Sequence, residues 1–283
     1  MKAAIANLKQ ASPEAVKTAA RGAARNLRRT TAGRRPDPGF LIIGAQKAGT
    51  TSLHAYLGAH PEVSPSTVKE VHYFDLSYGR GRGWYRAHFR PLRGAERMAG
   101  ESSPYYLYHP LVPRRVADDL PEAKLIAVLR NPVDRAFSHH NHERTLGFER
   151  LTFEVALERE DERLEGERER LIANPQITSF AHQHYSYLDR GRYAEQLETW
   201  FASVDPRRVL VLSAEDLFDS PAATLARAQE FLELEPHRPA DLSVRNGRRY
   251  SELPQATRAS LGARFGGANE ALYRLLDRDL GWG

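Results

Sequence analysis

The chain has 283 residues, 41% of them hydrophobic, which is enough for a substantial core and favours one large α/β domain over two small ones. It contains no cysteine, so neither disulfides nor a thiolate metal site can hold the fold, and a reducing cytoplasm is the expected location. The formal net charge is +5, no run approaches the roughly 18 apolar residues that cross a bilayer, and the first residues lack the apolar segment of a signal peptide.

Residues 1–38 are predicted to form a basic, Ala/Arg-rich extension. Residues 1–36 contain nine Lys/Arg against the single acid Glu14, so the remainder of the chain is mildly acidic. A solvated, partly helical arm is expected, and transient contact with anionic lipid, nucleic acid or a partner is the alternative. For the protein as a whole we expect no nucleic-acid partner, and any peripheral membrane contact would come from this arm.

From residue 39 onward, short β-like runs alternate with helix-like segments. This alternation predicts an α/β fold with a central, mainly parallel sheet covered by helices on both faces. The extended segments are Phe40–Gly44, Val71–Phe74, Lys124–Leu129 and Arg207–Leu212. The helical segments are Thr51–Gly58, Pro132–Glu143, Leu151–Leu171, Tyr193–Phe201, Ala222–Leu232 and Ala268–Leu276.

Two further expectations concern charge and the C-terminus. Residues 158–170 are nearly all charged, which predicts an exposed helix stabilised by i,i+4 pairs with no site on it. Trp282, next to the end of the chain, is expected to cap the core.

The stretch LIIGAQKAGTTSL, residues 41–53, has the pattern of a phosphate-binding loop. A strand that leads into a glycine-rich turn and a helix N-terminus directs backbone N–H groups and the positive helix end at an anion. Gly44 and Gly49 keep the glycine spacing of GxxxxGK[ST], but Thr50 replaces the lysine, and Lys47 lies inside the loop. Such a loop can wrap one phosphate while the ammonium reaches a second anionic group beside it.

A second anion signal follows the strand predicted at residues 124–129. The sequence Leu-Arg-Asn-Pro places Arg130 at a strand end and Pro132 at the start of a helix that also carries Ser138. The carboxyl ends of strands are where open α/β sheets bind ligands. Two phosphate sites on adjacent strand ends suit a nucleotide phosphorylated at both its 5′ and 3′ positions.

Four motifs together resemble the PAPS-dependent sulfotransferases, nearest to the heparan-sulfate type and its bacterial relatives (PAPS, 3′-phosphoadenosine 5′-phosphosulfate). The motifs are QKAGTTSL at 46–53, KEVHYF at 69–74, LRNP at 129–132 with Ser138, and NGRRY at 246–250. Their order and spacing match the family over residues 40–282. The resemblance implies a single P-loop-like sulfotransferase domain over residues 39–283.

The resemblance also implies the donor-binding residues. Lys47 would reach the oxygen that bridges the 5′-phosphate and the sulfuryl group, and so stabilise the leaving group. Arg130 and Ser138 would hold the 3′-phosphate, with Arg248 and Arg249 closing over it from a C-terminal loop. The residues that would cradle the 5′-phosphate are Ala48, Gly49, Thr50, Thr51 and Ser52.

Glu70 stands at the position of the family's catalytic glutamate, and we expect it to be the base that activates the acceptor hydroxyl. A partly desolvated site would raise its pKa and suit it to this task. His72, on the same side of the segment, would assist it or contact the acceptor. A sulfuryl group carries less charge than a terminal phosphate, so one lysine and backbone donors suffice and no metal is expected.

One departure from the family concerns the acceptor. Relatives carry a lysine where this chain has Ser102, which disfavours a heparan-like anionic acceptor, although nearby arginines could compensate: Arg80, Arg82 and Arg86. Three tyrosines could stack on a sugar or aryl ring, or serve as packing: Tyr105, Tyr106 and Tyr108.

Clustered histidines do not indicate a metal site. His139, His140 and His142 at i, i+1 and i+3 do not converge on one side of a helix, and there is no HExxH motif. His182 and His184 are expected to line an acceptor cleft or to pack on the surface.

The sequence thus predicts a cytoplasmic sulfotransferase that moves a sulfuryl group from PAPS to a hydroxyl of a carbohydrate, glycolipid or other small metabolite. A P-loop kinase using ATP is the enzymatic alternative, disfavoured by the lysine position and by the lack of an obvious magnesium-binding acid after a strand. A nucleotide-binding protein without turnover is the non-enzymatic alternative.

Overall fold

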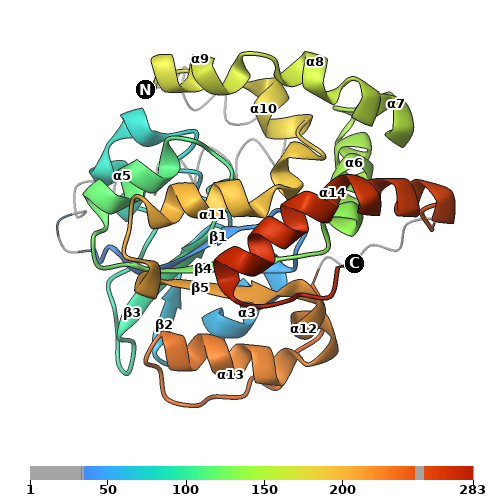
Figure 1. Cartoon of the computed structure of the whole chain (residues 1–283). Coiled ribbons are helices and arrows are strands. Elements are labelled where there is room, and N and C mark those ends of the chain that lie inside the picture. Colours follow the sequence, from blue (N-terminus) through green and yellow to red (C-terminus); the bar gives the residue numbers. More distant parts are fainter. Residues whose placement is uncertain (1–32, 34, 246–251, 283) are drawn as a thin grey trace, which may run out of the picture.

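The computed structural model describes residues 33, 35–245 and 252–282. Nearly all of the predicted extension 1–38, and the motif with Arg248 and Arg249, lie outside these residues. Within them, five parallel strands form one sheet in the order β2-β3-β1-β4-β5. Helices α11 and α14 cover one face, and α3, α12 and α13 cover the other (Figure 1). The predicted α/β architecture is confirmed.

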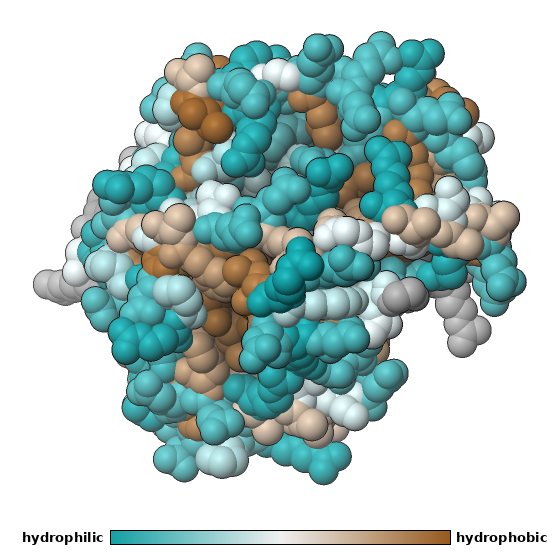
Figure 2. Space-filling model, in the orientation of Figure 1, coloured by the Kyte–Doolittle hydropathy of each residue, from teal (hydrophilic) through white to brown (hydrophobic). Residues whose placement is uncertain are grey.

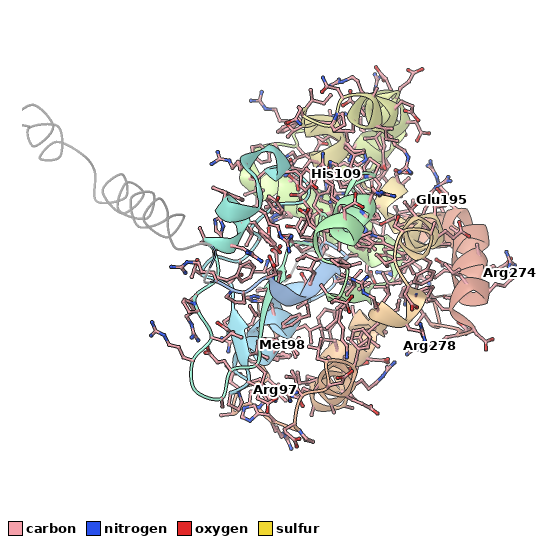
Figure 3. All side chains as sticks on the ribbon, turned by 90° about the vertical axis from the view of Figure 1, so that its left-hand side faces the viewer. Arg97, Met98, His109, Glu195, Arg274 and Arg278 are labelled. Atoms are coloured by element: carbon pink, nitrogen blue, oxygen red, sulfur yellow. The ribbon has the colours of Figure 1, made fainter. Side chains whose placement is uncertain are left out.

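All five strands run in the same direction. Their carboxyl ends, where sheets of this kind bind ligands, therefore lie along one edge of the sheet. Figure 3 shows this for β3, with Arg97 and Met98 near its lower end and His109, which follows the strand, above them. The strands are β1 Pro38–Gly44, β2 Val63–Pro65, β3 Met98–Ser102, β4 Lys124–Leu129 and β5 Val209–Ser213.

The helices connect these strands and also form a cover above the sheet edge. Those around the sheet are α3 Thr50–Gly58, α4 Arg82–Arg86, α5 Val112–Asp119, α11 Tyr193–Phe201, α12 Ala214–Asp219, α13 Pro221–Phe231 and α14 Gln255–Leu276. The cover consists of α6 Pro132–Leu146, α7 Phe153–Glu158, α8 Glu160–Leu164, α9 Glu167–Ala173 and α10 Phe180–His184. Single 3₁₀ turns are η2 Tyr78–Arg80, η3 Asp189–Gly191 and η4 Pro206–Arg208.

Most predicted elements are confirmed, because their signals are local. The strands at 40–44, 124–129 and 207–212 and the helices near 132, 193 and 222 occur within a few residues of their predicted bounds. The sheet buries both faces of β4, as its continuous apolar run requires. Trp282 is 4% exposed and belongs to the main core, as predicted.

The extended segment predicted at Val71–Phe74 is wrong. Glu70 and His72 have left-handed backbone angles, φ 59° and 53°, so this stretch turns instead of joining the sheet. The edge position belongs to the short β2, which the sequence did not reveal. Gly100 lies inside β3, where a Cβ atom would meet the Phe40 ring at 2.1 Å.

The single helix predicted over 151–171 is also wrong, since three short helices replace it. Gly166 adopts φ 69° between α8 and α9 and interrupts the helix. Within this charged stretch Glu160 is 1% exposed, and its carboxylate accepts hydrogen bonds from the backbone N–H groups of Leu188 and Asp189 at 2.8 Å. Burial outweighs these bonds and raises the pKa of Glu160 to about 7.

The last helix begins earlier than predicted, at Gln255 instead of Ala268. Glycines within this segment disfavour a helix locally, but burial of Leu261, Phe265 and Leu272 along one side stabilises it.

The outer surface shown in Figure 2 is mostly hydrophilic, with smaller hydrophobic areas between the helices. No helix in the described residues is long and apolar enough to cross a membrane.

Candidate functional site

The loop between β1 and α3 forms one wall of the site. Lys47 (φ 73°) and Gly49 (φ 87°) both adopt left-handed angles, which fold the loop back over the end of the strand. A Cβ atom on Gly49 would lie 2.9 Å from Cε1 of Phe218, so the position favours glycine twice over. Within the described part of the chain no side chain caps α3. Ser52 and Leu53 donate to the carbonyl oxygen of Gly49, and the N–H groups of Thr50 and Thr51 before them have no intrahelical acceptor.

The neighbouring junction between β4 and α6 is built differently. The Asn131 side chain caps α6 by accepting from the N–H groups of Val133 at 3.0 Å and Asp134 at 3.5 Å. Arg130 turns to the β1–α3 loop, where its Nη1 donates to the carbonyl oxygen of Lys47 at 3.1 Å. At this junction a ligand would meet the side chain of Arg130, whereas at the junction between β1 and α3 it would meet backbone N–H groups.

A cavity of about 250 Å³ opens beside the loop. It brings together Lys47, Glu70 and His72, the three predicted catalytic residues. Other lining residues are Gln46, Thr50, Thr51, Lys69, Pro104, Tyr105, His142, Glu143, Leu146, Gln183, His184 and Arg190.

The remaining predicted donor residues lie outside this lining. Ala48 and Ser52 are completely buried under the loop, and Ser138 is 6% exposed on α6. The Ser52 hydroxyl accepts from the backbone N–H of Arg245 at 2.8 Å, so the chain just before the NGRRY motif lies on α3. Arg248 and Arg249 are outside the described residues.

Glu70 belongs to a chain of hydrogen-bonded and paired charges. It accepts a hydrogen bond from Lys69, and one of its carboxylate oxygens lies 3.5 Å from Nε2 of His72. The other ring nitrogen of His72, Nδ1, lies 2.7 Å from the carboxylate of Asp75, whose side chain is completely buried. Asp75 was not predicted as a site residue. The signal that could have identified it is its position three residues after His72.

These contacts set the charges of the pair. Burial disfavours the ionised form of Glu70, but hydrogen bonds with His72 and Lys69 outweigh it and lower the pKa to about 2. Burial also disfavours the charged form of His72, but hydrogen bonds with Asp75 and Glu70 outweigh it and raise the pKa to about 10. The expected rise in the pKa of Glu70 is therefore wrong, because its neighbours decide the sign of the shift.

Backbone strain is concentrated at the same residues. Among described residues other than glycine, five have positive φ, and three of them are Lys47, Glu70 and His72; the others are Glu233 and Asp277. Each such angle costs on the order of 1–3 kcal/mol and persists where the surroundings impose it, as at ligand sites. This observation, independent of any motif, points to the same cavity.

Helices α6 and α10 form the opposite wall. Glu143 is 1% exposed, and its carboxylate oxygens lie 2.9 Å from Nδ1 of His184 and 3.2 Å from Nε2 of His139. Burial opposes ionisation of Glu143, but its histidine neighbours outweigh it and lower the pKa to about 2. No group of three potential metal ligands is arranged for coordination among the described residues.

Arg190 contacts the β1–α3 loop through Gln46, and it was not predicted as a site residue. It is buried, donates to Oε1 of Gln46 at 2.6 Å, and lies over the rings of Tyr105 and Tyr108 at 4.7 and 4.9 Å. No local pattern distinguishes it from the next arginine, Arg192. Tyr105, Tyr106 and Tyr108 are all at most 7% exposed, which agrees with packing, and only Tyr105 lines the cavity.

The comparison with protein families matches residues 37–247 to the sulfotransferase domain. The heparan sulfate glucosamine 3-O-sulfotransferase 6 of Mus musculus is 31% identical over 280 residues, covering 88% of this chain and 75% of the relative. The membrane-associated sulfotransferase kil1 of Dictyostelium discoideum is 26% identical, covering 87% of this chain and 66% of the relative.

Two further similar proteins show how much of each chain is matched. The human bifunctional heparan sulfate N-deacetylase/N-sulfotransferase 2 is 30% identical over 85% of this chain, which spans only 30% of that relative. The crystal structure of a sulfotransferase from Alicyclobacillus acidocaldarius has a TM-score of 0.73 and 30% identity, covering 87% of this chain and 99% of that one.

Proposed function

This chain belongs to the sulfotransferase family of enzymes, and from that premise we propose that it transfers the sulfuryl group of PAPS to a hydroxyl of a carbohydrate, glycolipid or other small metabolite. One observation carries the proposal: Lys47, Glu70 and His72 line a single cavity at the ends of parallel strands. Their strained backbone angles support a role in binding or chemistry.

On the donor side, the uncapped N-terminus of α3 suits the 5′-phosphate. In the proposal, backbone N–H groups of residues 48–52 and the hydroxyls of Thr50 and Thr51 hold this group. Arg130, with Ser138, holds the 3′-phosphate, and Arg248 and Arg249 are proposed to join it. Lys47 would stabilise the negative charge that develops on the leaving oxygen.

The transfer is proposed to proceed by in-line attack. The acceptor oxygen forms a bond to sulfur, the bond from sulfur to the bridging oxygen breaks, and 3′-phosphoadenosine 5′-phosphate leaves. Glu70 takes the hydroxyl proton. Its low pKa makes it a weak base in the free protein, so the contacts with Lys69 and His72 must loosen when ligands bind. No metal is required in this scheme.

Domain limits and location are also proposals. Residues 39–283 would form the catalytic domain, and residues 1–38 would form an extension capable of peripheral membrane contact. We propose a cytoplasmic location, and fractionation of cells that express the full chain would test it against membrane association. Recovery in the membrane fraction after a high-salt wash, which releases peripheral contacts, would overturn it.

The decisive experiment is calorimetric titration with 3′-phosphoadenosine 5′-phosphate and, separately, ATP, each with and without magnesium. We expect tight, metal-independent binding of the bisphosphate and weak binding of ATP. A preference for magnesium-ATP would overturn the proposal in favour of a P-loop kinase. If the bisphosphate binds but no acceptor is ever sulfated, the chain is a nucleotide-binding protein without turnover.

A further inference from the structure

Three exposed apolar side chains lie in or beside the cavity lining, which includes Leu146. Leu146 and Phe180 are each 49% exposed and Phe148 is 41% exposed. The rings of Phe148 and Phe180 are 5.4 Å apart in an edge-to-face arrangement. Scattered apolar side chains on a surface need no explanation, but a contiguous group usually marks a binding surface.

His184 connects this group to the cavity. Its ring lies 4.8 Å from that of Phe148 and 4.4 Å from that of Phe180, and both His184 and Leu146 line the cavity. We call Leu146, Phe148, Phe180 and His184 the rim cluster. A molecule whose hydroxyl lies near Glu70 would therefore extend directly onto the rim cluster.

The rim cluster is held in place by backbone contacts. Gly147, at φ 78°, ends α6, and the N–H of Phe148 donates to the carbonyl oxygen of Glu143 at 3.0 Å. The Tyr185 hydroxyl donates to the carbonyl oxygen of Phe148 at 3.1 Å. Phe180 opens α10, where Ser179 caps the helix. Hydrogen bonds of the flanking backbone therefore hold the rings of Phe148 and Phe180 in their exposed positions.

The cations that line the cavity are held by neighbouring groups or assigned to the donor. His72 lies between Glu70 and Asp75, Arg190 donates to Gln46, and Lys47 is proposed to act at the leaving oxygen.

Of the three arginines expected to compensate for Ser102, Arg82 and Arg86 pair with Asp37 and Arg80 lies over the Trp84 ring, and none of them lines the cavity. At the cavity itself, Lys69 pairs with Glu70. Ser102 is completely buried and offers nothing to a ligand.

We infer that the rim cluster is the subsite for the apolar part of the acceptor, and that the acceptor is an uncharged hydroxyl compound with an alkyl chain or aromatic ring. The inference rests on the proposed function, and it narrows the acceptor to amphipathic molecules. His184, fixed by Glu143, would contact the acceptor where its polar and apolar parts meet.

Binding of matched glucosides tests the subsite directly. Methyl and hexyl β-D-glucopyranoside, and a heparan-derived hexasaccharide, would be titrated by saturation-transfer NMR into protein saturated with 3′-phosphoadenosine 5′-phosphate. Each buried methylene is worth about fourfold in affinity. We expect hexyl glucoside to bind more than tenfold tighter than methyl glucoside, and tighter than the hexasaccharide.

The double variant Phe148→Ser/Phe180→Ser should reduce the advantage of the hexyl chain to less than threefold while still binding the bisphosphate. Ile172→Ser is the matched control, because Ile172 is also 49% exposed but lies on α9 outside the cavity lining. It should keep the full hexyl advantage. Equal binding of the two glucosides, tighter binding of the hexasaccharide, or an unchanged hexyl advantage in the double variant would each overturn the inference.

The two proposals fail separately in this design. Absence of bisphosphate binding would count against the sulfotransferase assignment alone, since the glucosides can be titrated without it. Bisphosphate binding without any dependence on chain length would leave the assignment intact and remove the subsite.

Discussion

The two walls of the cavity, named the donor wall and the acceptor wall after their proposed ligands, are built by different means. The donor wall follows the ends of β1 and β4 and uses helix termini, whose geometry the sheet imposes. The acceptor wall comes from α6 and α10, which lie above the sheet edge and present side chains such as Glu143 and His184. The contrast teaches that the sheet fixes the position of the donor wall, whereas the acceptor wall can change side chains without disturbing the sheet.

Lys47→Ala should break the donor wall most severely. Loss of the ammonium removes charge stabilisation of the leaving oxygen, so kcat should fall about 10²–10³-fold. Affinity for the bisphosphate should change only a few-fold, because the backbone donors remain. Transfer from radiolabelled PAPS and calorimetry measure the two effects, and Lys124→Ala, which removes an ion pair with Glu233, is the control. An unchanged kcat would exclude the proposed role.

Glu70→Gln tests the proposed base at the cavity. Removal of the base should lower kcat about 10²-fold with little change in bisphosphate affinity. The control is Glu62→Gln, since Glu62 pairs with Arg97 and is not part of the cavity lining. Full activity of Glu70→Gln would show that another group accepts the proton.

Arg130→Ala should act on binding instead of chemistry. A hydrogen bond to a charged group is worth about 1.5–3 kcal/mol, so the Kd of the bisphosphate should rise about tenfold or more while kcat changes less. Arg207→Ala removes an exposed guanidinium paired with Asp205 and serves as the control. A fall in kcat with unchanged Kd would place Arg130 with the catalytic residues.

Gly49→Ala should destabilise the fold at the donor wall. The left-handed angle and the approach to Phe218 are expected to lower the free energy of unfolding by about 1–3 kcal/mol in urea denaturation. Gly262→Ala offers an opposite control, because its Cβ would enter open space within α14. It should raise the free energy of unfolding by about 0.5–1 kcal/mol. Equal effects of the two changes would contradict a strained loop.

The last test concerns pH. The pKa of His72 is raised from 6.5 to about 10 in the folded protein, so its stabilising contribution is complete below pH 6.5 and disappears as the pH rises to 10. Chemical denaturation across this range should show a flatter pH dependence for His72→Asn than for the unsubstituted protein. His237→Asn, at a ring that packs on His60, should keep the original slope. Parallel curves for all three proteins would disprove the coupling.

The donor wall could be predicted from sequence because its signals are short and local. An apolar strand, two glycines and a helix start fix the loop around Lys47, and a buried strand ending in Arg130 fixes its neighbour. Gly49 shows the limit of this reasoning: the turn could be predicted, but its contact with Phe218 joins residues far apart in the chain.

The tertiary contacts of the charged residues could not be predicted to the same degree. Glu160 was read as exposed because its neighbours are charged, yet it binds the backbone before η3. The pKa of Glu70 depends on Lys69 and on His72, whose charge in turn depends on the buried Asp75. Such effects arise from tertiary contacts, which periodicity and composition do not contain.

The position of β1 has a consequence for synthesis of the chain. It lies at the centre of the sheet, where Phe40 is opposite both Gly100 and Lys124. As the chain leaves the ribosome, this apolar strand precedes both of its pairing partners, so the loop that carries Lys47 cannot reach its final form until β4 has emerged. Non-local pairing of this kind slows folding and leaves an aggregation-prone segment exposed meanwhile. The strand that supports the Lys47 loop is therefore also a segment of the nascent protein that stays unpaired until later strands are made.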